Sequence, residues 1–90
     1  MTRDELSTAA ESLERAAETA DGEDARERLR AQSTQFDSLA DADRGPDHGK
    51  IARHEHILTE LAAEEGGETA EHIEAALESI RAYRETVEGV

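Results

Sequence analysis

The chain has 90 residues, with 23 acidic against 10 basic side chains and a formal net charge of −13. It contains no cysteine, which excludes a disulfide, a thiolate metal site and a thiol nucleophile. No apolar run approaches the roughly 20 residues that span a bilayer, and the N-terminus lacks the apolar core of a signal peptide. We therefore expect a cytoplasmic protein with no membrane partner and a single helical domain over residues 1–90.

The excess of acid is typical of proteins that work in concentrated salt. Lys50 is the only lysine, and large apolar residues are few. At low ionic strength the carboxylates repel one another, whereas in molar salt the Debye length falls to about 3 Å and most of this repulsion is screened. We therefore expect the cytosol of a salt-accumulating organism, and we interpret most of the acid as a hydrated surface.

Three breaks divide the chain into four predicted helices. The breaks are Asp21-Gly22, residues 44–46 (Arg-Gly-Pro) and Gly66-Gly67. Glycine commonly ends a helix, and proline just beyond the end cannot continue it. The predicted helices span residues 2–20, 23–43, 47–65 and 68–88, and three acid–base pairs at helical spacing, Glu11–Arg15, Asp24–Arg28 and Glu78–Arg81, are expected to support them weakly.

Apolar residues recur at helical spacing in every predicted helix. In chain order the four stripes are Leu6, Ala9, Leu13, Ala16, Ala17 and Ala20; Ala25, Leu29, Phe36, Leu39 and Ala40; Ile51, Ile57, Leu58, Leu61 and Ala62; and Ala70, Ile73, Leu77, Ile80 and Val87. Because the loops are short, successive helices should be antiparallel neighbours. The prediction is an all-α fold, either an up-down helical bundle or paired αα-hairpins. The alanine-rich first helix buries little area, so we expect a homodimer with an apolar interface, and a weakly stable monomer is the alternative.

Residues 44–56 form the one segment that is not net negative, and they hold three of the four histidines. A helix start favours anions, because its backbone N–H groups are free and its dipole is positive there. Arg44, His48, Lys50 and Arg53 are therefore candidate ligands for a phosphate or a carboxylate. No Walker or dinucleotide fingerprint accompanies them. The alternative is a plain helix–helix turn whose basic residues pair with nearby acids.

Two histidines in this segment resemble a metal-binding pair, but helical geometry separates them. His54 and His56 lie about 200° apart on a helix, so both cannot bind one ion. His54 falls on the apolar stripe and His56 faces water. His54 could still meet His72, yet a histidine on an apolar face is more often a hydrogen-bonded core residue. We therefore expect no metal and no cofactor.

Gln32 is a second polar residue on an apolar stripe, between Leu29 and Phe36. A buried amide can fix helix register at some cost in stability. We expect Gln32 at a helix interface, hydrogen-bonded either to His54 or to Gln32 of a second copy.

Catalysis is disfavoured, because the serines lack a recognisable nucleophile setting and the paired carboxylates lie on solvated faces. We expect no catalytic residues and no enzyme. Nucleic-acid binding through Lys50, Arg53 and His56 is disfavoured by the net charge.

Residues 44–61 (RGPDHGKIARHEHILTEL), set among short acidic helices, resemble a family of small uncharacterised proteins of halophilic archaea. The resemblance implies a salt-loving cytoplasmic protein with a helical fold, and it brings no assigned activity. The best interpretation of the sequence is a non-enzymatic helical interaction module that self-associates. The alternative is a module that binds a small anion through residues 44–53.

The charge pattern predicts that folding depends on salt. Helicity followed by circular dichroism should rise as KCl increases from about 0.01 M to about 2 M, because screening removes repulsion between carboxylates. Full helicity in salt-free buffer would contradict this expectation.

Overall fold

The computed structural model describes residues 4–41 and 48–88, with side chains described for 4–40 and 49–85. Over these ranges every regular element is an α-helix: α1 (Asp4–Thr19), α2 (Glu23–Asp41), α3 (His48–Glu65) and α4 (Gly67–Glu88). The all-α prediction is confirmed, and each predicted helix matches an observed one with small differences at the ends. Acidic residues occupy the first turns of α1 and α2, where negative charge suits the helix dipole.

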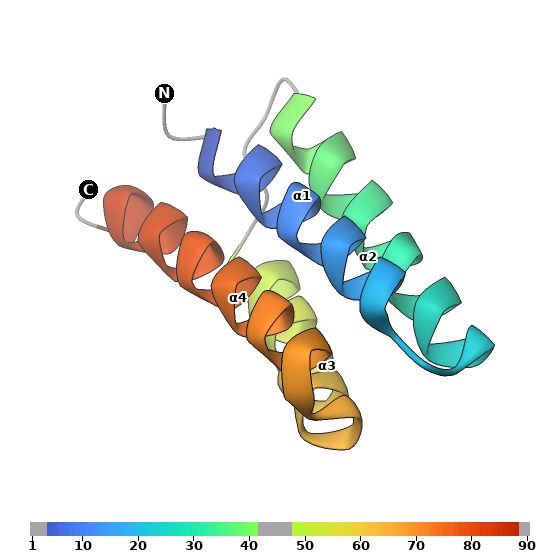
Figure 1. Ribbon diagram of the computed structural model, residues 1–90. Coiled ribbons are helices and arrows are strands. Elements are labelled where there is room, and N and C mark those ends of the chain that lie inside the picture. Colours follow the sequence, from blue (N-terminus) through green and yellow to red (C-terminus); the bar gives the residue numbers. More distant parts are fainter. Residues whose placement is uncertain (1–3, 42–47, 89–90) are drawn as a thin grey trace.

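The four helices form two αα-hairpins (Figure 1). In the first hairpin α1 packs against α2, and in the second α3 packs against α4. The hairpins meet mainly through α1 and α4, whereas the backbones of α2 and α3 approach each other at few places. Of the two architectures that the sequence predicted, the paired hairpins describe the structure better than a closed bundle does.

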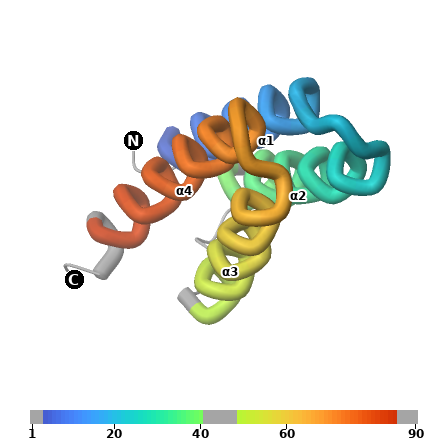
Figure 2. The backbone as a smooth tube through the Cα atoms, turned by 60° about the horizontal axis from the view of Figure 1, so that its bottom comes forward, coloured from blue at the N-terminus to red at the C-terminus, as the bar shows by residue number. Residues whose placement is uncertain are grey.

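The turn between α3 and α4 depends on two glycines with left-handed backbone. Gly66 and Gly67 have φ angles of 65° and 58°, a conformation that side chains disfavour. The Gly66 N–H donates to the carbonyl oxygen of Ala62 at 3.0 Å, which ends α3. Figure 2 shows α3 and α4 diverging from this turn, so the two helices are closest near it.

Alanine dominates the face of α1 that contacts α2 and α4. Ala9, Ala16 and Ala17 are fully buried together with Leu6 and Leu13. A methyl group fills little space, so two neighbouring helices can approach the α1 backbone closely. The largest buried side chains come from all four helices: Leu6, Leu13, Leu29, Phe36, Ile51, Leu58, Leu61, Ile73 and Ile80.

Two buried or half-buried hydroxyl contacts fix how α1 sits against its neighbours. Ser33 of α2 donates its hydroxyl hydrogen to the carbonyl oxygen of Ala10 at 2.8 Å. The hydroxyls of Thr19 and Thr69 lie 2.8 Å apart and join the end of α1 to the start of α4. These contacts satisfy polar groups that would otherwise be costly to bury.

Among the described helices, none is long and apolar enough to cross a membrane. The mean hydropathy of the chain, −0.80, agrees with that finding.

Close packing of α1 predicts that its alanines resist enlargement. Ala16→Leu should lower the free energy of unfolding by about 1–3 kcal/mol, because Ala16 is fully buried between helices. The same change at exposed Ala31 of α2 is the matched control and should stay within about 0.5 kcal/mol. Denaturant unfolding of both variants at high salt measures the difference, and equal stabilities would contradict the packing argument.

Candidate functional site

The four residues predicted to bind an anion are only partly described. Lys50 and Arg53 lie on α3 with exposed side chains. Arg44 lies outside the described residues, and so does the side chain of His48, which begins α3. The anion site therefore stays a prediction from the sequence.

Gln32 and His54 meet at the interface between α2 and α3. The Nδ1 atom of His54 donates to Oε1 of Gln32 at 2.8 Å, and both side chains are half-buried. The imidazole also packs on the Phe36 ring in an edge-to-face arrangement, with ring centres 5.1 Å apart and an angle of 61° between the ring planes. This is the hydrogen bond that the sequence analysis expected for Gln32 within one chain. It joins two helices whose backbones rarely approach each other.

Burial lowers the pKa of His54 below its ordinary value of 6.5, and the cations of Lys50 and Arg53 lower it further. All three causes disfavour the imidazolium form. In neutral His54 the hydrogen bond to Gln32 fixes the hydrogen on Nδ1, and the ring packs on Phe36 without placing a charge beside that apolar side chain. The histidine therefore acts as a structural link between α2 and α3 at neutral pH.

The other described histidines lie apart from this contact. His56 is exposed, and its Nε2 atom is 3.3 Å from a carboxylate oxygen of Glu60. The Nε2 atom of His72 is 3.7 Å from Glu68. Within the described residues, no group of three or more metal-ligating side chains comes together. The structure thus places His54 on the inner side of α3 and His56 on the outer side, as the helical spacing predicted.

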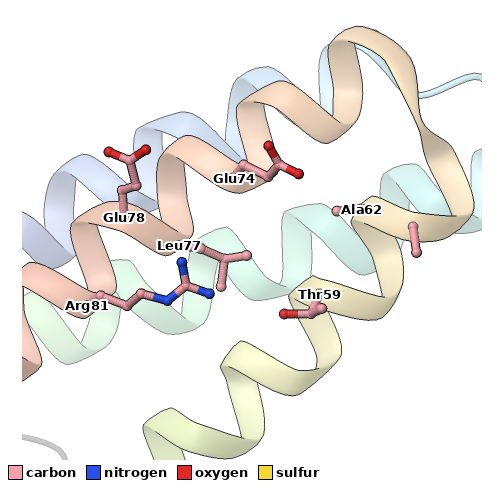
Figure 3. Close-up of a pocket in the computed structure, with 7 residues that line it drawn as sticks. Thr59, Ala62, Glu74, Leu77, Glu78 and Arg81 are labelled. Carbon is pink, nitrogen blue, oxygen red and sulfur yellow. The ribbon is translucent and has the colours of Figure 1, made fainter.

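A groove of about 410 Å³ runs along the outer side of the α3–α4 hairpin (Figure 3). Seven residues line this α3/α4 groove: Thr59, Ala62 and Ala63 from α3, and Glu74, Leu77, Glu78 and Arg81 from α4. Leu77 lies at its floor and is 4% exposed. The α3 wall is built from small side chains, and the α4 wall carries the charges. Such a groove has room for side chains of another helix.

A second hollow of about 300 Å³ shares Arg81 with the α3/α4 groove and is lined by Glu55, Arg81, Arg84 and Glu85. Here Arg84 of α4 donates to Oε1 of Glu55 of α3 at 2.8 Å. The two side chains are only 25% and 17% exposed, so this ion pair is better shielded from water than a surface pair. It holds α3 and α4 together where they diverge.

Arg81 differs from Arg84 in its surroundings. Its side chain projects along the α3/α4 groove beside Leu77 (Figure 3). Within the described part of the chain, no carboxylate lies within 4.0 Å of its guanidinium. The three pairs expected from helical spacing, Glu78–Arg81, Glu11–Arg15 and Asp24–Arg28, are therefore not ion pairs within 4.0 Å in the structure. Arg28 instead approaches Glu64 across helices, at 3.9 Å.

Sequence reasoning missed the α3/α4 groove because it assigned Ala62 and Leu77 to the core stripes. Thr59, Ala62 and Ala63 are small residues at helical spacing, and this run is the signal that could have indicated a shallow face. The groove also needs the divergence of α3 from α4, which no local pattern encodes. The carboxylates and the guanidinium of its lining can form ion pairs, and the small side chains of its α3 wall leave room for a helix.

The comparisons with known proteins place the chain in a family. The model of the "Family of unknown function (DUF7553)" matches residues 1–86, so the chain belongs to this family. No curated protein and no solved structure matches the chain.

The lowered pKa of His54 predicts a pH-dependent contribution to stability. The unfolded chain binds a proton at His54 near pH 6.5, and the folded chain binds it only at lower pH. The stabilising contribution is therefore complete above 6.5 and is lost as the pH falls through the folded pKa.

This contribution is measured by denaturant unfolding at constant KCl between about pH 7.5 and about pH 5. Protonation of carboxylates changes stability over the same range, so the informative quantity is the difference from His54→Gln. Wild type should lose more stability on acidification than this variant does. A matched His56→Gln variant controls for the loss of one imidazole, and parallel curves for wild type and His54→Gln would contradict the prediction.

Proposed function

We propose that this member of the family is a non-enzymatic helical interaction module that self-associates as a homodimer. The α3/α4 groove is the observation that supports the proposal. A second copy of the chain is the occupant that we assign to it.

The groove replaces the interface that the sequence suggested. The apolar stripes face one another within a single chain, where Leu13, Leu29, Leu58 and Ile80 are fully buried. They therefore leave no continuous apolar face for a partner among the described residues. The α3/α4 groove differs because small side chains line its α3 wall and Leu77 closes its floor. A helix can pack there without rearrangement of the core.

The charges of the groove favour a second copy over a partner of one sign. Its α4 wall carries Glu74 and Glu78 together with Arg81. A strongly basic partner would meet Arg81, and a strongly acidic one would meet the glutamates. A second copy offers both signs on the same wall, so opposite charges can be brought together.

The net charge of −13 opposes the association of two copies at low salt, and high salt screens this repulsion. Two copies repel each other over about 10 Å at 0.1 M salt, and over only about 3 Å at 1 M salt. We therefore propose a cytoplasmic protein of a halophilic organism, in which screening allows two acidic chains to pack. The acidic surface and the resemblance of residues 44–61 to proteins of halophilic archaea support this setting.

The test measures the mass of the protein in solution at about 2 M KCl. Light scattering or sedimentation should give a dimer for wild type at micromolar concentrations. Thr59→Glu should weaken dimerisation about tenfold or more, because the longer side chain occupies the groove and offers a carboxylate to Arg81. The Thr59 hydroxyl donates to the carbonyl oxygen of Glu55 on its own helix and holds no other helix in place, so the fold should survive.

Thr34→Glu is the matched control. Thr34 is an exposed threonine within α2, away from the groove, and its replacement adds the same charge and volume. This variant should dimerise like wild type. A monomeric wild type at high salt would overturn the proposed function, and equal weakening by both variants would show that net charge alone is responsible.

A further inference from the structure

The α4 wall of the α3/α4 groove carries opposite charges in a symmetric order. Glu74 and Arg81 are seven residues apart, which is about two helical turns or roughly 10 Å along the axis. Both line the groove, and both are exposed. Leu77 and Glu78 lie midway between them. This spacing is the observation from which the geometry of a dimer can be derived.

We propose that α4 packs antiparallel to α4 of a second copy, with Arg81 of each copy bound to Glu74 of the other. This inference rests on the proposed self-association and adds its orientation, its register and its specificity-determining residues. A two-fold axis passes between Leu77 and Glu78, so one contact occurs twice.

The surroundings of Arg81 support this pairing. No carboxylate within the described residues lies within 4.0 Å of its guanidinium. In contrast, Arg84 is bound to Glu55 in the same chain. Arg81 projects into the groove beside Leu77 (Figure 3). A carboxylate from a second copy would therefore reach a guanidinium that none of the described carboxylates contacts within 4.0 Å.

The orientation follows from the repulsion of like charges. In a parallel pair of α4 helices, Glu74 would face Glu74 and Arg81 would face Arg81, which is unfavourable. In the antiparallel register each of these residues faces its opposite. Glu85 comes opposite Ala70, whereas the two Glu78 side chains lie close together beside the axis. Their repulsion is the cost of this register, and screening by salt lowers it. Leu77 is 4% exposed and belongs to the core of its own chain, so the two ion pairs on either side of the axis determine the orientation.

Charge reversal tests the pairing directly. Glu74→Arg and Arg81→Glu should each weaken the homodimer about tenfold or more, because each creates two like-charge contacts. The double variant, with both changes in one chain, should dimerise like wild type. A mixture of the two single variants should form a heterodimer, since each supplies the charge that the other lacks. Native mass spectrometry distinguishes the heterodimer from homodimers by mass.

The controls separate pairing from net charge. Glu11→Arg and Arg15→Glu make the same charge changes at exposed positions on α1, outside the groove. They should not alter dimerisation in about 1 M KCl and should show no mutual rescue. Circular dichroism of every variant verifies that the helices are intact.

Each outcome decides the inference. Weakening by both single variants, with recovery in the double variant and in the mixture, supports it. The pairing would be overturned if the charge reversals left dimerisation unchanged, or if the double variant did not restore it. Neither result would contradict self-association itself. A monomeric wild type would overturn both the pairing and the proposed function.

Discussion

Close packing of α1 through alanine is the constraint on which the rest of the structure depends. Ala9, Ala16 and Ala17 are fully buried, and α1 contacts both α2 and α4. A helix lined by methyl groups brings its neighbours close but supplies little apolar area for them to share. The chain therefore gains cohesion by surrounding one thin helix on two sides. Because the two hairpins meet mainly through α1 and α4, the backbones of α2 and α3 approach each other at few places.

On the loosely packed α2–α3 side, polar side chains provide much of the contact between the two helices. Gln32 and His54 share a hydrogen bond across this interface, and Arg28 approaches Glu64. The second contact is exposed and long, so it adds little stability. The contact between Gln32 and His54 is half-buried, and the His54 ring also packs on Phe36. Burial there favours the neutral imidazole over the imidazolium form. α3 packs mainly against α4 and diverges from it away from the Gly66-Gly67 turn (Figure 2). The α3/α4 groove is lined by residues of these two helices.

Periodicity predicted what depends on one helix at a time. The four helices and the inward position of His54 follow from 3.6 residues per turn. Gln32 and His54 are both polar residues on apolar stripes, and this position predicted their hydrogen bond. The groove depends on the angle between two helices, which arises from packing of the whole chain. The cross-helix pair of Arg84 and Glu55 depends on the same angle. Local spacing favoured Glu78 for Arg81, yet an exposed pair of that kind is worth only a few tenths of a kcal/mol and is readily lost.

High salt gives the two kinds of charge on this protein different weights. The many carboxylates on the outer faces act at long range, and salt screens them almost completely. A guanidinium and a carboxylate in direct contact are closer together than the Debye length, so salt screens their attraction less. In the dimer that we propose, salt would therefore screen the repulsion between the two chains more than it screens the direct ion pairs. At high salt, contacts made by the few basic residues would therefore determine the orientation of a partner more than the 23 acidic residues do. Arg81 lies in the α3/α4 groove beside Leu77, so it is the basic residue best placed to bind a carboxylate of a second copy.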